Sequence, residues 1–97
     1  MDEFIVKIND KDFTFRVKKM NGIQALSFRS LFFNMKDNVE KSNLAYYTIL
    51  ENTQVLVGNS WCDVKQGNSF IPEGLENSAT TILEIASKFL DYLKTFF

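Results

Sequence analysis

Residues 78–96, SATTILEIASKFLDYLKTF, carry the most regular pattern in the chain. Apolar residues recur there at three- and four-residue steps, the spacing that places side chains on one face of an α-helix. The residues on this face are Ile82, Ile85, Ala86, Phe89, Leu93 and Phe96, and it is widened by Leu83, Leu90 and Phe97. Asn77 or Ser78 would cap this helix by accepting a hydrogen bond from an otherwise unpaired amide. We predict a C-terminal helix over 78–96.

At the other end of the chain, the apolar pattern has a period of two. Residues 4–8 and 12–17 are rich in β-favouring side chains, and Phe13, Phe15 and Val17 alternate with polar residues. This alternation is typical of a strand buried on one face. The polar connector 9–11 has the length of a hairpin loop. We predict a β-hairpin over 4–17, packed on another element because an isolated hairpin is only marginally stable in water.

The middle of the chain predicts two more helices, over 23–35 and 40–54. Residues 55–57 can fray into strand, and residues 61–64 are predicted as a short strand at the start of a structured loop over 58–77. That loop holds the sole proline and three glycines. The expected fold is a single α+β domain over 1–97, with the N-terminal hairpin packed on three helices.

Composition and charge restrict the possible partners and the location. The net charge is −1 at pH 7 over 97 residues, so the chain lacks the excess of cations that drives nonspecific nucleic-acid binding. No apolar run approaches the ~20 residues that span a bilayer. Acidic residues stand at positions 2 and 3, where a signal peptide would be basic, and the single cysteine cannot form an internal disulfide. We expect a protein of the host-cell cytoplasm that binds neither nucleic acid nor membrane.

The residue types needed for common catalytic and metal sites are missing or isolated. The chain has no histidine, so it offers neither a Ser-His-Asp triad nor an imidazole ligand, and Cys62 has no second thiol. Glu73 and Glu76 form a carboxylate pair suited to acid–base work, but they flank a predicted helix entrance, where the helix dipole also favours acids. We expect a protein that is not an enzyme and that uses no metal or cofactor.

Aromatic residues are in excess, with ten phenylalanines in the chain. Each could fill the core, yet the helix predicted over 23–35 is apolar on most of its circumference. Such a helix is either central in the fold or covered by a partner. We interpret the excess as a surface for partner binding or self-association. The candidate partner-binding residues are Phe28, Phe32, Phe33, Tyr46, Trp61, Phe96 and Phe97.

Three stretches together carry a family resemblance: INDKDFTFRV (8–17), WCDVKQGNSFIPEGLEN (61–77) and ILEIASKFLDYLKTFF (82–97). In this layout the chain resembles the tail assembly chaperones of long-tailed bacteriophages and of prophages in low-GC Gram-positive bacteria. The resemblance implies a non-enzymatic role in coating the long, largely helical tape-measure protein, keeping it soluble and helping to recruit tail-tube subunits. It also implies that Trp61 and Pro72 shape the loop that docks the last helix.

Two other functions stay open at this point. The first is a small phage or mobile-element inhibitor that blocks a host defence protein by covering its surface. The second is a minor structural protein that remains in the virus particle. The resembled family often makes a second, longer chaperone by ribosomal frameshifting. The codons of Phe96 and Phe97 could supply the uridine run for such a slip, although the same residues also finish the apolar face of the last helix.

Overall fold

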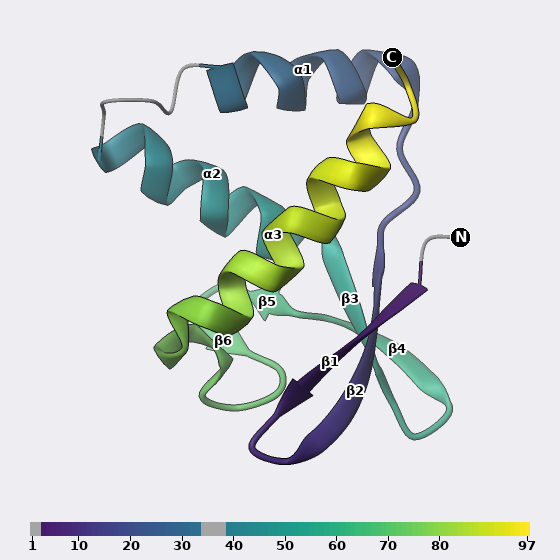
Figure 1. Ribbon diagram of the computed structural model, residues 1–97, viewed down its shortest axis with the longest axis vertical. Helices are drawn as coiled ribbons and strands as arrows, with labels where there is room; N and C mark the ends of the chain where they lie inside the picture. Colours follow the sequence, from purple (N-terminus) through teal and green to yellow (C-terminus); the bar gives the residue numbers. More distant parts are fainter. Residues whose placement is uncertain (1–2, 34–38) are drawn as a thin grey trace.

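The computed structural model describes residues 3–33 and 39–97. These residues form an α+β fold with an N-terminal antiparallel hairpin and three α-helices, as predicted (Figure 1). The elements in chain order are β1 (Glu3–Ile8), β2 (Lys11–Val17), α1 (Gly22–Phe33), α2 (Val39–Glu51), β3 (Thr53–Val57), β4 (Ser60–Asp63), β5 (Lys65–Gln66), β6 (Ser69–Phe70), the 3-10 turn η1 (Leu75–Asn77) and α3 (Ala79–Lys94).

The hairpin turns through a two-residue loop, because Lys11 already pairs with Ile8. Asn9 and Asp10 have φ angles of 50° and 66°, in the left-handed region. A loop with both central residues in that region matches the right-handed twist of the flanking strands, and Asn and Asp are the side chains that tolerate it best after glycine. The turn is therefore encoded by its own residues.

The predicted helix over 40–54 is wrong at its end, since α2 stops at Glu51 and Thr53–Val57 forms β3. β3 pairs antiparallel with β2, with Phe15 opposite Val55. Both side chains are fully buried. The β-branched residues of this stretch suit a strand. Its backbone groups form hydrogen bonds with β2 in place of the bonds that they would form within a longer helix.

β4 confirms the short strand expected near Trp61 and completes a four-stranded sheet in the order β1-β2-β3-β4. The loop predicted over 58–77 is thus more regular than expected, since it also contains the small β5–β6 sheet and η1. The periodicity of apolar residues over such short runs does not predict which distant strands pair.

Of the two predicted caps of α3, Asn77 and Ser78, the structure shows Ser78 at the N-cap. Its Oγ accepts a hydrogen bond from the Thr81 amide at 3.3 Å. The helix ends at Lys94 rather than at 96, and the last residues continue in a turn with the Phe97 amide bonded to the Lys94 carbonyl. At the start of α1, Asn21 and Gln24 exchange hydrogen bonds in a reciprocal cap. The predicted end of that helix at 35 lies outside the described residues.

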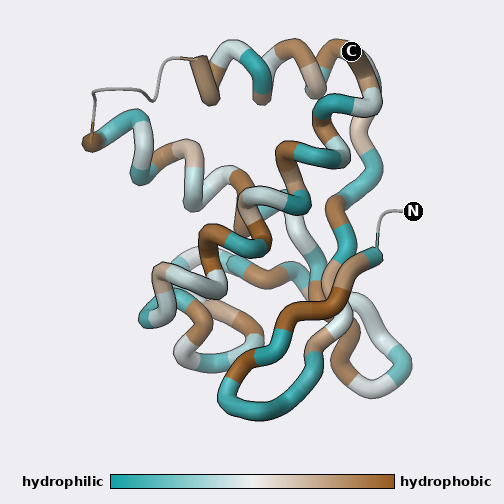
Figure 2. The backbone as a smooth tube through the Cα atoms, in the orientation of Figure 1, coloured by the Kyte–Doolittle hydropathy of each residue, from teal (hydrophilic) through white to brown (hydrophobic). Residues whose placement is uncertain are grey.

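α2 and α3 contact the strands, with α2 against β3 and α3 against β1, and α1 packs on α2 and α3 at the far end of the molecule (Figure 1). Apolar segments alternate with polar ones along α3 in Figure 2, as a helix with one buried face requires. The core between helices and sheet includes the fully buried side chains of Phe15, Val55, Leu75, Ile85 and Phe89. No helix in the described part of the chain is long and apolar enough to cross a membrane.

Candidate functional site

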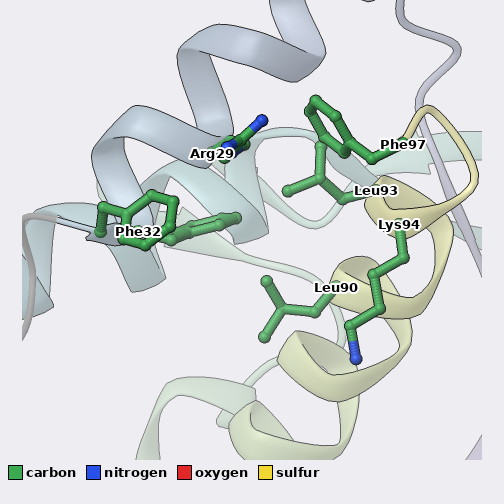
Figure 3. Close-up of a pocket in the computed structure, with 7 residues that line it drawn as sticks. Arg29, Phe32, Leu90, Leu93, Lys94 and Phe97 are labelled. Atoms are coloured by element: carbon green, nitrogen blue, oxygen red, sulfur yellow. The ribbon is translucent and has the colours of Figure 1, made fainter.

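Three adjoining hollows form one groove along the flank of α3. The first, of about 540 Å³, lies between α1 and the C-terminal turns of α3 (Figure 3). The second, of about 410 Å³, shares Phe32 and Leu90 with the first. The third, of about 460 Å³, lies between α2 and the first turns of α3, and it shares Tyr46 and Leu83 with the second. We call these three adjoining hollows together the α3 groove.

The floor of the α3 groove exists because the apolar arc of α3 is wider than the core can cover. Ile85 and Phe89 are fully buried in the core. Leu83 and Leu90 lie to one side of them on the helix and remain 55% and 36% exposed. Phe97 follows Leu90 by seven residues, two turns further on, and it is 60% exposed. The opposite flank of α3 carries Lys88 and Asp91 and lines a separate, more polar hollow.

α1 forms the facing wall with a row of aromatic rings whose exposure increases towards solvent. Phe28 and Phe32 meet the buried ring of Phe89 edge-on, with centroids 5.2 and 6.1 Å away. Such perpendicular ring pairs are favourable beyond the area that they bury. Phe33, the next residue, points away from the core and is 72% exposed. The wall is therefore anchored by Phe28 and Phe32 and extended towards solvent by Phe33.

The two ends of the groove differ in charge. The first hollow is lined by Arg29 and Lys94 and by no described acidic residue. The Arg29 guanidinium carbon lies 5.0 Å from the ring centroid of Phe97 and 5.6 Å from that of Phe33, so two cation–π contacts hold it there. Figure 3 shows Arg29 and Phe97 reaching towards one another across the gap. The third hollow is lined by Glu76 and by no described basic residue, while the middle one is uncharged.

The structure brings Phe32, Phe33, Tyr46 and Phe97 of the predicted partner-binding residues together around the groove. Phe28 anchors the wall through Phe89 but lines no hollow of the groove, and neither does Phe96, which packs edge-on against Tyr92 at 5.6 Å. Sequence reasoning placed Leu83 and Leu90 on the apolar face but did not single them out. The arrangement of Arg29, Lys94 and Glu76 at opposite ends had no signal in the sequence, because it depends on how α1, α3 and η1 meet.

Trp61 belongs to the other face of the sheet. Its neighbour Cys62, opposite Val55, packs against the core, so the Trp61 side chain points outward. The Arg16 guanidinium carbon lies 4.2 Å above its ring centroid. β4 and the start of α3 lie on opposite sides of the molecule in Figure 1. Pro72 lies in the loop that leads into α3, between β6 and η1.

A polar network surrounds Trp61 on this outer face. Arg16 Nε donates to Gln54 Oε1 at 2.9 Å, and Gln54 Nε2 donates to Asp63 Oδ1 at 3.1 Å. Lys18 Nζ lies 3.1 Å from Asp63 Oδ2. The hydrogen bond from Gln54, followed by that from Lys18, lowers the pKa of the Asp63 carboxyl below its ordinary value of 3.8. These contacts tie β2, β3 and β4 together.

Within residues 3–33 and 39–97, no three cysteine or carboxylate side chains gather closely enough to hold a metal ion. A comparison with family models, with curated proteins and with solved structures finds no match to the chain. The α3 groove is apolar along its length, walled by aromatic rings and charged at its ends.

Proposed function

We propose that the protein is a non-enzymatic phage tail assembly chaperone of the host cytoplasm, which binds helical segments of the tape-measure protein in the α3 groove and helps to recruit tail-tube subunits. The observation that carries this proposal is the row of large apolar side chains left open along α3 and α1: Leu83, Leu90, Phe97 and Phe33. Contiguous exposed apolar surface of this kind marks interaction sites on small soluble domains.

A helix is the occupant that fits the walls of the groove. These walls are mainly side chains of α1, α2 and α3, whose backbone amides and carbonyls are already bonded within each helix. An extended peptide laid there would leave its own backbone groups without partners in an apolar setting, which is costly. A helix satisfies its backbone internally and presents only side chains, as in other helix-in-groove complexes.

The dimensions of the groove agree with this occupant. α3 has 16 residues, and at about 1.5 Å per residue it is about 24 Å long. The hollows follow α3 from Ala79 to Phe97. A partner helix of similar length would place about four apolar side chains, at i, i+3 or i+4 and i+7 spacing, over the groove. The family resemblance in the sequence supplies the identity of that helix, since the tape-measure protein is long and largely helical.

Capture of the tape-measure protein tests the proposal. The protein with an N-terminal tag is co-expressed with the tape-measure protein encoded downstream in the same gene cluster, and the complex is recovered on the tag. We expect the double variant Phe33→Ser, Leu90→Ser to bind at least about tenfold more weakly, since each buried side chain of this size contributes about 1.5–3 kcal/mol. Phe33 is 72% exposed and Leu90 is 36% exposed, and circular dichroism checks that the variant keeps the fold before capture is compared.

Ile5→Ser is the matched control, because Ile5 is 65% exposed but lies in β1, outside the groove. Equal capture by the double variant and the wild type would contradict the groove as the binding site. A gene cluster without a tail-tube gene upstream and a long tape-measure gene downstream would contradict the assignment to tail assembly.

A further inference from the structure

The charges at the ends of the α3 groove distinguish the two directions in which a helix could lie in it. Arg29 and Lys94 line the end beside the C-terminus of α3, and Glu76 lines the end beside its N-terminus. Among the described residues, no acidic side chain forms an ion pair with Arg29 or Lys94. A helix carries about half a positive charge at its N-terminus and about half a negative charge at its C-terminus.

We propose that the α3 groove fixes the polarity of its partner: the bound amphipathic helix lies parallel to α3, with its C-terminal turn between Arg29 and Lys94 and its N-terminal turn beside Glu76. This inference rests on the proposed function and adds to it the direction of the bound segment and the character of its ends. The preferred segment has acidic residues or free carbonyls at its C-terminal end and basic residues or free amides at its N-terminal end.

The dipole of α3 itself opposes this direction, but the side-chain charges at each end of the groove are larger than the partial charges of the dipole. The C-terminus of α3 contributes about half a negative charge at the basic end. Arg29 and Lys94 contribute two full positive charges there, so the end stays positive. At the other end, the half positive charge of the α3 N-terminus is exceeded by the full negative charge of Glu76.

One further contact favours the same direction, and one cation at the acidic end opposes it. Arg29 is held by the rings of Phe33 and Phe97 before any partner arrives, so little side-chain entropy is lost when it meets a helix end. Lys65 reaches the acidic end, with Nζ 5.3 Å from the ring centroid of Tyr47. Its charge is already engaged, because Nζ donates to the Gly67 carbonyl at 2.7 Å and lies 3.8 Å from Glu51.

Paramagnetic broadening of amide resonances measures the direction. The probe is a 16-residue amphipathic peptide with leucines at helical spacing, neutral glutamine flanks and blocked ends, carrying a nitroxide at either terminus. Bound to the full ¹⁵N-labelled protein, the C-terminal nitroxide should broaden the amides around Arg29 and Lys94, and the N-terminal one those around Asn43 and Ala79. We expect a preference of about twofold to fivefold for each charged contact, which falls at high salt.

Two triple variants serve as matched controls, since all three side chains are exposed. Arg29→Glu, Lys94→Glu, Glu76→Lys should exchange the two broadening patterns. Arg29→Gln, Lys94→Gln, Glu76→Gln should abolish the parallel preference, leave only the weaker antiparallel preference set by the α3 dipole, and retain binding. Peptide that binds the wild type in both directions equally, or antiparallel to α3, overturns the inference and leaves the proposed function standing. Failure of the peptide to shift any groove resonance overturns both.

Discussion

The Asp63 carboxylate shows how one residue links three strands on the outer face of the sheet. It accepts a hydrogen bond from Gln54 on β3 and pairs with Lys18, which follows β2. Its folded-state pKa therefore lies below the ordinary value, which applies in the unfolded chain. A depressed pKa contributes stability above the unfolded pKa, and that contribution is lost as the pH falls through the folded pKa.

We expect Asp63→Asn to lower the free energy of unfolding by about 0.5–1 kcal/mol at pH 7, the range of a partly exposed ion pair. The difference from the wild type should begin to shrink as the pH falls below the unfolded pKa of about 3.8, and it should be lost as the pH falls through the lower folded-state pKa. Urea unfolding at pH 7, 5 and 3 measures this. Asp91→Asn, on the exposed flank of α3, is the control. A difference that stays constant from pH 7 to pH 3 would rule out an electrostatic origin.

Phe32 and Phe33 are adjacent in the sequence but have different roles in the structure. Phe32 lines the groove and also contacts the buried ring of Phe89, so its replacement disturbs the core as well as the surface. Phe33 is mostly exposed and touches the Arg29 side chain. Substitution of Phe33 therefore reports on binding, whereas substitution of Phe28 or Phe32 reports on folding and binding together.

At the scale of elements, the N-terminus of α3 depends on Ser78. Its Oγ accepts from the Thr81 amide and lies 3.0 Å from the Thr81 hydroxyl. Ser78→Ala should destabilise the protein by about 1 kcal/mol, the usual cost of losing a side-chain cap. Ser78→Asp should keep most of that stability, because its carboxylate can accept the same bond. Urea midpoints of the two variants decide this. An alanine variant as stable as the wild type would mean that packing alone fixes the start of α3.

At the scale of the whole molecule, the apolar surface of the groove continues over the outer side of α1. Ile23 and Leu26 are largely exposed there, on the same side of the helix as Phe33. A surface of this extent favours association of copies when no partner covers it. Self-association and helix binding would then compete for the same side chains.

We expect the mass from light scattering to rise above 11.2 kDa with concentration for the wild type. Leu26→Ser, Phe33→Ser should remain monomeric, and Ile5→Ser should behave as the wild type. Saturating amphipathic peptide should return the wild type to one protein chain per particle, since the peptide occupies the groove. A wild-type protein that stays at 11.2 kDa at every concentration would contradict self-association.

The sequence by itself determined the elements whose signals are local. The period-2 alternation of Phe13, Phe15 and Val17 and the helical repeat from Ile82 to Leu93 correspond to β2 and α3. The cap of α3 could be narrowed to Asn77 or Ser78 because a cap is made within a few residues of chain, and the structure selects Ser78. The row of Leu83 and Leu90 beside the core face could also be read from helical spacing, since the turn angle of a helix fixes which residues share a side.

Only the tertiary structure decided the rest. Residues 53 and 54 were expected in a helix and residues 55–57 were expected only to fray into strand, yet Thr53–Val57 forms a full strand because β2 offers hydrogen bonds from about forty residues away. Trp61 faces away from the helices because Cys62 takes the core position opposite Val55. Arg29, Lys94 and Glu76 are far apart in the sequence, and they give the groove its two charged ends only because α1 and η1 pack at opposite ends of α3. The local periodicity of apolar residues indicates whether a segment can form a helix or a strand. The packing of distant segments then decides which apolar side chains stay exposed.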